Sequence, residues 1–332
     1  MSERVLVTGG TGFVGGWAIV ALLNRGYRVR TTVRSLTRQA GLRSAIARAA
    51  DAGDRLEVVA ADLTSDAGWA EAAAGCAFVM HIASPLAMNG ETDPDALIAA
   101  AKDGTLRVLR AAVEARAERV VLTSSMAACT PTRPQARAFD ESDWSDPDQP
   151  GLAAYRRSKI LAERAAWDFM AGKATQLTTI LPGAIFGPVL NKDQLGSVGL
   201  IKQLLDGKPP VLPRLAFNII DVRDLAELHL EAMIRPAAAE ERFIATGEAL
   251  WYGEVAQALK ENLGAAAGRV PTRAMPDFVA RALSLVSPQM KSLMPLLGRT
   301  QKFSTQKARD RLGFAPRPAG ETVVDCGRSL IA

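Results

Sequence analysis

The sequence predicts an α/β protein built on a doubly wound parallel sheet, and two observations carry that prediction. Up to Gly183, short apolar runs alternate with longer stretches of helical periodicity. The short runs are continuously apolar rather than alternating, which is typical of strands covered on both faces. Strands that alternate with helices form right-handed crossovers, so helices should cover both faces of the sheet.

The expected elements follow from these patterns in chain order. The predicted strands are residues 5–7, 29–33, 56–60, 78–83, 120–122 and 177–181, and the predicted helices between them are 13–24, 37–50, 69–74, 94–115 and 154–171. Beyond Gly183 the pattern is less regular because Gly and Pro interrupt it. There we expect strands at 217–220 and 242–246 and helices at 222–234 and 253–263.

Composition excludes several classes of protein. The chain has 332 residues, a net charge of +5 and a pI near 9.3, but Lys and Arg are scattered among Asp and Glu without a long basic block. This indicates a mildly basic solvated surface and no nucleic-acid partner. Three cysteines without a CxxC pair and two distant histidines argue against a disulfide framework and a metal site. A secretory pattern and a long apolar run are both absent, so we expect a cytoplasmic protein with no membrane partner.

A glycine-rich turn lies between the first predicted strand and the first predicted helix. Glycines there allow a tight turn, a close approach of the backbone to a pyrophosphate and close packing of helix on strand. The helix N-terminus offers N–H groups and a positive dipole end to the anion. The pattern therefore predicts the dinucleotide cradle of a Rossmann-type domain, formed by Gly9, Thr11, Gly12, Phe13, Val14 and Gly15.

The end of the second predicted strand indicates which dinucleotide binds. Binders of the non-phosphorylated cofactor usually carry an acid about 20 residues after the glycines. Here Arg34 follows the strand and Arg38 lies one turn on. Arginine makes charge-assisted, often bidentate bonds to a phosphate, so these residues predict NADP(H). The alternative is that both arginines begin a solvated helix.

Further cofactor contacts are expected where the third to fifth strands end, because ligands of such sheets collect at the carboxyl ends of strands. Asp62 and Leu63 follow the third strand, and Asp62 is as readily explained as a turn residue as by a contact with adenine. Ala83 and Ser84 follow the fourth strand, and Thr123 follows the fifth.

Tyr155 and Lys159 are four residues apart on a predicted helix and therefore share one face. A free tyrosine has a pKa of about 10, too high for efficient acid–base chemistry at neutral pH. A nearby ammonium favours the phenolate, so we expect Lys159 to lower the pKa of Tyr155. A serine at the end of the fifth strand could bind the substrate oxygen. We favour Ser125 over Ser124, since strand-end hydroxyls such as those of Thr123 and Ser124 often satisfy backbone groups.

With these motifs together, the chain resembles the extended short-chain dehydrogenases/reductases, and within them the dihydroflavonol 4-reductase-like branch of NADPH-dependent ketone and aldehyde reductases. The resemblance covers nearly the whole chain. Besides the motifs above it is carried by the segments 81–85, 181–188, 221–224 and 304–309.

The resemblance implies that Ser125, Tyr155 and Lys159 form the catalytic triad, that Lys159 also binds the nicotinamide ribose, and that Pro182 and Ile185 pack at the nicotinamide end. It implies hydride transfer to a substrate carbonyl with Tyr as proton donor, and a homodimer. The chain departs from the family pattern at Met126, where relatives often have Ala, and at the pair Arg156-Arg157, which we expect to face solvent.

These expectations divide the chain into two parts. Residues 1–186 with about 217–235 should form the Rossmann domain, and 187–216 and 236–332 a smaller C-terminal α/β substrate lobe. Loops after Ser84, after Ser125 and at 187–199 should rim the pocket, with 274–297 as a cover, and their apolar character suggests an apolar or aromatic carbonyl substrate. The alternatives are an NAD-dependent nucleotide-sugar epimerase or dehydratase of the same fold, and a non-catalytic dinucleotide sensor.

Overall fold

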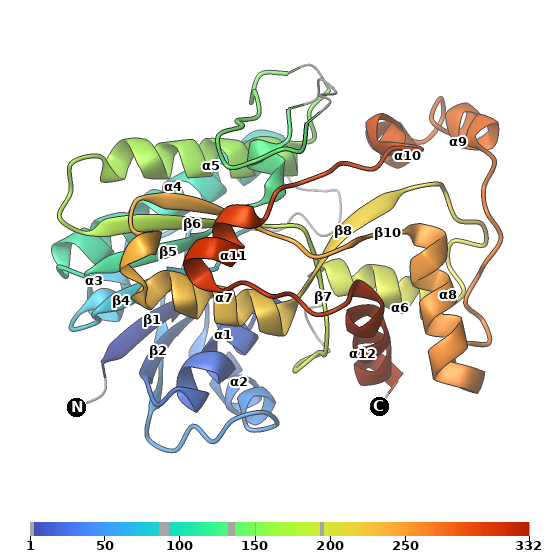
Figure 1. The fold of residues 1–332 in the computed structure, drawn as a ribbon. Coiled ribbons are helices and arrows are strands. Elements are labelled where there is room, and N and C mark those ends of the chain that lie inside the picture. The colour runs from blue at the N-terminus through green and yellow to red at the C-terminus, as the bar shows by residue number, and fades with distance from the viewer. Residues whose placement is uncertain (1–2, 86–92, 132–136, 150, 193–195, 332) are drawn as a thin grey trace.

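A seven-stranded parallel sheet forms the centre of the computed structural model, which describes residues 3–85, 93–131, 137–149, 151–192 and 196–331. The strand order is β3-β2-β1-β4-β5-β6-β9, and every neighbouring pair is parallel (Figure 1). The strands are β1 Arg4–Thr8, β2 Arg28–Val33, β3 Leu56–Ala60, β4 Phe78–His81, β5 Arg119–Thr123, β6 Gln176–Pro182 and β9 Glu241–Ala245. The predicted Rossmann-type sheet is confirmed.

Helices cover both faces of this sheet, as the apolar runs predicted. One face carries α1 Phe13–Asn24, α2 Gln39–Ile46 and α7 Val222–Ile234; the other carries α3 Trp69–Ala73, α4 Pro94–Glu114 and α5 Ala154–Met170. Successive residues of a strand point to opposite faces. Val5 and Val7 accordingly lie in the core under α1, whereas Leu6 lies in the core under α4. Each strand is buried on both sides, which is why its sequence is apolar without alternation.

A smaller lobe is built on a second sheet, ordered β10-β8-β7, with β7 Ala184–Phe186, β8 Ala216–Asp221 and β10 Ala249–Trp251. Three helices pack around it: α6 Gly199–Leu205, α8 Tyr252–Leu263 and α12 Ala319–Ile331. Two short helices, α9 Asp277–Leu283 and α10 Pro288–Leu293, lie together at one end of this lobe, and α11 Gln306–Leu312 returns to pack on β9 (Figure 1).

Three strands lie in the other sheet from the one that the predicted division of the chain implies: β7, which falls within 1–186, and the two predicted strands β8 and β9. The stretch 242–246 was assigned to the substrate lobe, but β9 pairs with β6, from Thr178↔Glu241 to Pro182↔Ala245, as the edge of the large sheet. The stretch 217–220 was assigned to the Rossmann domain, but β8 lies between β7 and β10 in the small sheet. These two assignments were wrong because short apolar runs do not reveal which partner strand they meet.

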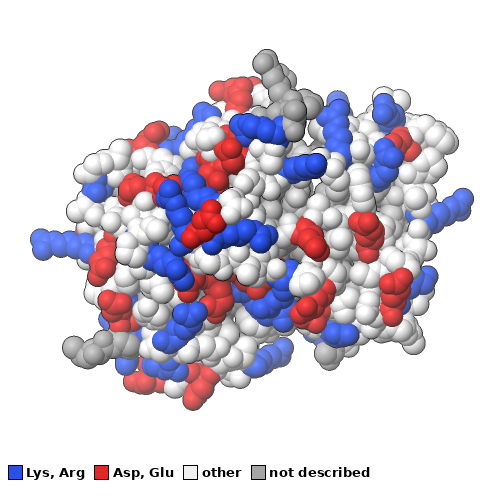
Figure 2. Space-filling view, in the orientation of Figure 1, with Lys and Arg blue, Asp and Glu red and all other residues white. Residues whose placement is uncertain are grey.

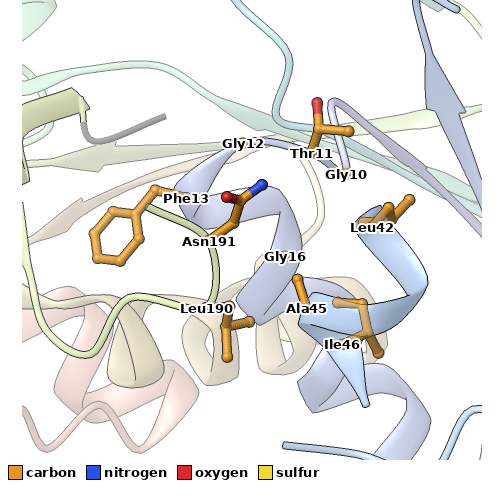
Figure 3. Close-up of a pocket in the computed structure, with 10 residues that line it drawn as sticks. All are labelled: Gly10, Thr11, Gly12, Phe13, Gly16, Leu42, Ala45, Ile46, Leu190 and Asn191. Atoms are coloured by element: carbon orange, nitrogen blue, oxygen red, sulfur yellow. The ribbon is translucent and has the colours of Figure 1, made fainter. Parts of the chain in front are cut away.

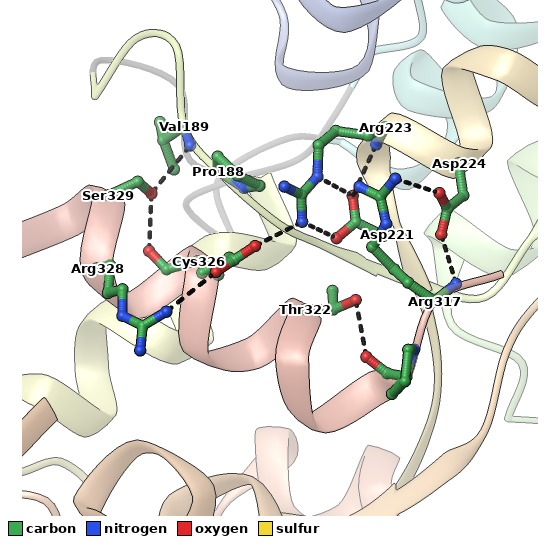
Figure 4. Close-up of polar contacts among 12 residues, drawn as sticks. Pro188, Val189, Asp221, Arg223, Asp224, Arg317, Thr322, Cys326, Arg328 and Ser329 are labelled. Atoms are coloured by element: carbon green, nitrogen blue, oxygen red, sulfur yellow. Dashed lines mark hydrogen bonds and ion pairs between the residues drawn. The ribbon is translucent and has the colours of Figure 1, made fainter. Parts of the chain in front are cut away.

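A cluster of charged residues joins α12 to the turn between β8 and α7 (Figure 4). Asp221 is fully buried, caps the N-terminus of α7 through the Arg223 N–H, and accepts two hydrogen bonds from the Arg223 guanidinium, at 2.9 and 2.7 Å. Arg223 also bonds Asp325 of α12 at 2.8 Å. Arg317, just before α12, pairs with Asp224 at 3.0 Å and with Asp221 at 3.6 Å. These five residues, the Asp221 cluster, fix the C-terminal helix to the sheet domain.

Charged side chains of both signs are interspersed on the face shown in Figure 2, as the scattered sequence pattern suggested. Within the described residues no helix is long and apolar enough to span a bilayer. The same residues contain no cluster of three or more His, Cys, Asp or Glu side chains arranged to hold a metal ion.

Candidate active site

The glycine loop between β1 and α1 has the geometry of an anion cradle. Gly9 has φ of +75°, and its carbonyl accepts the Gly12 N–H at 2.9 Å. A Cβ at Gly15 would collide with that same carbonyl, so helix and loop could not approach so closely with any other residue. Helix α1 has Gly12 as its N-cap, no side chain caps it, and its first turn holds no acid. Its first N–H groups therefore remain available to a phosphate.

Two threonines that the sequence analysis missed hold this loop in place. The Thr8 hydroxyl oxygen accepts the N–H groups of Ile82 and Ala83, at 3.1 and 3.0 Å, and lies 2.8 Å from His81 Nδ1. The Gly9 N–H donates to the Thr32 hydroxyl at 3.3 Å. The ends of β1, β2 and β4 are thereby tied together, which puts the predicted residue Ala83 directly beside Gly9. A threonine at the end of a buried strand is the sequence signal that could have indicated this role.

A cavity next to the loop brings in a segment far away in the sequence (Figure 3). It is lined by the loop and α1, by α2, and by Leu190 and Asn191, which follow β7. The Trp17 indole holds this segment by donating to the Pro188 carbonyl at 2.7 Å. We expected 187–199 at the substrate rim, but Leu190 and Asn191 lie against the glycine loop. No local pattern in the sequence indicates such a contact.

The predicted arginines lie exposed beyond the end of β2. Arg34 follows the strand and Arg38 ends a short 3-10 turn; neither has a carboxylate within ion-pair distance in the described part of the chain. Asp62 holds a turn: its Oδ1 accepts the N–H and the hydroxyl of Thr64, each at 2.8 Å. Those two bonds and the charge of Arg34 keep the pKa of Asp62 below its usual value. Leu63 packs against Gly104 of α4.

Lys159 and Tyr155 lie on the first two turns of α5. Lys159 is buried and its Nζ donates to the Thr123 carbonyl at 3.2 Å. Burial lowers the pKa of Lys159 to about 8, against a raising effect of Glu163. Tyr155 keeps 38% of its surface exposed, yet desolvation of its hydroxyl raises its pKa, and a hydrogen bond with Ser125 partly opposes this. The expected lowering by Lys159 was wrong, because desolvation raises the pKa of Tyr155 and Ser125, not Lys159, is the group that opposes this rise.

Three consecutive hydroxyls at the end of β5 have different partners. The Thr123 hydroxyl lies 2.7 Å from His229 Nε2; His229 Nδ1 must donate to the Leu225 carbonyl at 2.8 Å, so Thr123 donates to the neutral ring. Ser124 donates to Glu163 Oε2 at 2.5 Å. Ser125 accepts the Ala127 N–H at 3.1 Å and is the hydroxyl that meets Tyr155.

A second cavity joins several predicted residues around Lys159. Ala83, Ser84 and Thr123 line it with Lys159, and Glu163, which the sequence analysis did not single out, lies there as well. Residues 86–92 after Ser84 fall outside the described residues, as do 132–136 and 193–195 from the other two expected rim loops.

The segment expected at the nicotinamide end runs from β6 into β7. Pro182 is the last, buried residue of β6, and Ile185 pairs with Ile220 in the small sheet. Between them, a Cβ on Gly183 would collide with the Asn218 carbonyl and touch the Met126 sulfur. Met126 is itself buried and packs in a core cluster, so this departure from the family pattern fills the space behind the segment.

The expected solvent exposure of the Arg156-Arg157 pair was wrong for Arg156. Its side chain is half-buried and donates to the Thr130 carbonyl at 3.1 Å. Burial lowers the pKa of Arg156. Arg157 pairs with the exposed Asp148 at 3.0 Å. The first turn of α5 is therefore packed against the segment that follows β5.

Comparison with known proteins identifies the family of this chain. The model of the NAD-dependent epimerase/dehydratase family matches residues 5–246, which include both the glycine loop and the Tyr155–Lys159 helix. The chain belongs to this family. Its members include the extended short-chain dehydrogenases/reductases, so the predicted resemblance is confirmed.

Several relatives of this chain are reductases. Cinnamoyl-CoA reductase 1 of Petunia hybrida is 31% identical over 99% of this chain and 92% of that enzyme. An anthocyanidin reductase of Vitis vinifera is 32% identical over 69% of this chain and 72% of its own length. The crystal structure of Candida albicans Gre2 in complex with NADPH superposes with a TM-score of 0.82 at 25% identity, covering 99% of this chain and 98% of that one. The family member described here is therefore an oxidoreductase.

Proposed function

We propose that this family member is an NADPH-dependent reductase that converts a ketone or aldehyde to an alcohol. The observation that carries the proposal is the buried Lys159, whose Nζ donates to the Thr123 carbonyl at the end of β5. Tyr155 lies one turn before it on α5, and Ser125, two residues after Thr123, is the group that opposes the rise of the Tyr155 pKa. An acid, a substrate-oxygen donor and a positioned ammonium are thus on one edge of the sheet, beside the glycine loop. This is the arrangement that protonation of a reduced carbonyl oxygen requires.

The chain's residues fit the cofactor. A Cβ at Gly10 would collide with Thr31, and one at Gly15 with the Gly9 carbonyl, so the glycines let the loop pack closely on the sheet and on α1. This packing supports close approach of a pyrophosphate to Gly12, Phe13 and the open N-terminus of α1. Thr11 and Val14 complete the turn, and Lys159 with Ser84 and Ala83 would hold the nicotinamide ribose side. Pro182 and Ile185 would lie at the nicotinamide ring. When bound, NADPH supplies a hydride to the substrate carbonyl carbon.

Each member of the triad then has a distinct task. Ser125 donates a hydrogen bond to the substrate oxygen and stabilises the charge that develops there. Tyr155, which is protonated at neutral pH, gives that oxygen a proton; because burial raises its pKa, the transfer depends on a positive charge that stabilises the phenolate. Lys159, held by the Thr123 carbonyl, supplies a positive charge that stabilises the phenolate left behind.

The phosphorylated cofactor is supported by the end of β2. Arg34 and Arg38 are exposed there and the segment 34–38 that follows β2 contains no acid, so two guanidinium groups are available to a 2′-phosphate. Asp62 and Leu63 would lie at the adenine, although the hydrogen bonds of Asp62 to Thr64 commit one of its oxygens to the turn. An NAD-dependent epimerase or dehydratase would carry an acid at this strand end.

The substrate proposed is an apolar or aromatic carbonyl compound. The names of two relatives specify cinnamoyl and anthocyanidin substrates, which contain aromatic rings. The small lobe built on β7, β8 and β10 would bind the substrate, with β9 and α7 counted in the Rossmann domain. Fold alone does not fix a substrate, so this proposal needs a direct test.

The test is a panel of aliphatic, aromatic and sugar carbonyl compounds, supplied with NADPH that carries deuterium at the transferred position. We expect oxidation of NADPH with at least one apolar carbonyl and deuterium at the new carbinol carbon. Tight binding of NADPH without reduction of any compound in the panel would favour a dinucleotide sensor instead. Cofactor that stays bound through purification and does not exchange would favour an epimerase or dehydratase.

A further inference from the structure

Glu163 is a fully buried carboxylate that the proposed reaction does not use. It lies on α5, one turn beyond Lys159 and two turns beyond Tyr155. Its Oε2 accepts the Ser124 hydroxyl at 2.5 Å and its Oε1 accepts the Thr179 hydroxyl of β6 at 2.9 Å. Burying a carboxylate costs free energy unless each of its oxygens accepts hydrogen bonds. The donors around Glu163 are therefore placed to satisfy both oxygens.

Arg242 of β9 neutralises this carboxylate. Its Nε donates to Glu163 Oε1 at 2.8 Å, and its guanidinium stacks on the Trp144 ring with the carbon 3.7 Å from the centroid. Its Nη1 donates to the carbonyls of Glu141 and Asp143, which belong to the loop covering the sheet edge. Arg242 is thereby held by two segments, α5 and the loop 141–144, and it fixes the orientation of Glu163 in turn.

The second cavity places this carboxylate beside the proposed machinery. Lys159, Thr123 and Ser124 line the same cavity as Glu163. Ser124, which Glu163 holds, is the residue directly before Ser125, and Thr123, whose carbonyl holds Lys159, is directly before Ser124. Glu163 thus holds the β5 turn through its hydrogen bond with Ser124 and lines the same cavity as the lysine, whose pKa its charge raises.

We propose that Glu163 is a positioning residue of this active site, which holds the Ser124–Ser125 turn and the Lys159 ammonium in their working arrangement through a buried network anchored by Arg242. The proposal rests on the proposed function, because it gives Lys159 and Ser125 the roles assigned there. It adds a residue from β9, the last strand of the sheet, to the support of the reaction.

The charge balance around Lys159 makes the proposal measurable. The other titratable groups facing Lys159 are Tyr155 on its own helix and His81 on β4, whose pKa burial lowers to about 3. Both are neutral at pH 7. Among the described residues, Glu163 is therefore the group whose negative charge raises the pKa of Lys159 against the lowering effect of burial, which brings that pKa to about 8. Its removal should lower the pKa of Lys159 further, so the ammonium is lost at lower pH.

The experiment compares wild type with Glu163→Gln, which keeps the shape and removes the charge. The pKa of Lys159 is followed by heteronuclear NMR of protein with labelled lysine, and its signal is assigned from the loss in Lys159→Arg. We expect the pKa to fall by about one pH unit or more in Glu163→Gln. The matched control is Thr179→Val, which removes one hydrogen bond to Glu163 but keeps its charge, and should leave the pKa of Lys159 near 8.

The same shift should appear in the alkaline limb of kcat/KM, because loss of the ammonium switches off reduction. If Glu163→Gln fails to fold, Glu163→Asp, which moves the charge away by one methylene, should give an intermediate fall. An unchanged Lys159 pKa in the folded variant overturns the proposal. The NMR titration needs no turnover, so a shift in a protein that reduces no carbonyl would refute the proposed function while still showing that Glu163 raises the pKa of Lys159.

Discussion

At the residue scale, the end of β5 shows how three adjacent hydroxyls acquire different roles. Thr123 is committed to His229 and Ser124 to Glu163, so Ser125 is the one of the three that faces Tyr155. The preference for Ser125 over Ser124 agrees with this placement. The sequence could not give the partner of Ser124, because Glu163 is 39 residues away in the chain.

Ser125→Ala and Ser124→Ala form a matched pair for this assignment. Loss of the Ser125 donor should lower kcat by about 100- to 1000-fold, the usual effect of removing one hydrogen bond to a developing oxyanion. Ser124→Ala should lower kcat by less than about tenfold, but it should lower the free energy of unfolding by about 1.5–3 kcal/mol because it removes a charge-assisted bond to Glu163. Steady-state kinetics and urea unfolding measure both. The reverse ranking of the two kcat values would move the role to Ser124.

The direction in which the pKa of Tyr155 shifts could not be predicted from its four-residue separation from Lys159. A four-residue separation puts phenol and ammonium on one helix face, but it says nothing of how much protein surrounds the hydroxyl. In the structure the ammonium is turned toward the Thr123 carbonyl, and desolvation is the largest influence on the phenol. Predicting the direction of a pKa shift therefore requires knowledge of the packing around the group as well as its spacing from a charge.

At the element scale, the cradle is an assembly of strand ends. Thr8 of β1 binds the backbone after β4, and Thr32 of β2 binds the Gly9 N–H, so the glycine loop is held from two sides. The arginines at the end of β2 lie outside this framework and are exposed. Their freedom from structural ion pairs means that substitution there should change cofactor selection without disturbing the fold.

Arg34→Ala tests that selection. We expect KM for NADPH to rise by roughly 10- to 100-fold, because charge-assisted hydrogen bonds contribute about 1.5–3 kcal/mol each, while KM for NADH stays nearly constant. The control is Arg28→Ala, at the opposite end of β2, where the side chain bonds Asp54. Equal changes for both cofactors in Arg34→Ala would show that this arginine does not read the 2′-phosphate.

Elements with a local signal were predicted well, and those without one were not. Helices α1 and α7 have the predicted bounds, because amphipathic or buried periodicity and flanking glycine or Asp caps mark both ends. The predicted helix 37–50 instead begins with a 3-10 turn and ends at Ile46. The strands β7 and β10, three residues each, were missed, since their existence depends on β8 lying between them.

At the scale of the whole molecule, two lobes are joined through α7 and the C-terminal helix. The Asp221 cluster lies at this junction, and Gly187 lies against the Asp221 carboxylate, so the cluster also supports the backbone that follows β7. Opposite charges at a buried position resist separation because each would be left without a partner.

Asp221→Asn should therefore destabilise the protein. We expect a loss of about 2–3 kcal/mol, somewhat below the range for a fully buried pair because Arg223 and Arg317 are partly exposed. Asp325→Asn, which removes a more exposed partner of Arg223, should cost about 1 kcal/mol or less. Urea unfolding at pH 7 measures both, and equal losses would contradict a central role for Asp221.

The strands of the sheet were predictable up to β6 and their assignment to one sheet was not predictable beyond it. Strand–helix alternation predicts six parallel strands covered by helices on both faces, but it does not determine their order. The seventh, β9, follows an excursion into the small lobe, and no local feature of 242–246 indicates a return to the large sheet. The ion pair between Arg242 and Glu163 of α5 depends on this return and therefore could not be predicted from the sequence.

The measurement that tests the central claim most directly is the turnover of Tyr155→Phe against its affinity for NADPH. The account predicts that kcat for carbonyl reduction falls by about 100- to 10,000-fold, because the proton donor is lost, while the Kd for NADPH changes by less than about threefold. Turnover close to that of wild type, with the cofactor still bound, would show that Tyr155 does not protonate the substrate oxygen and would contradict the reductase mechanism.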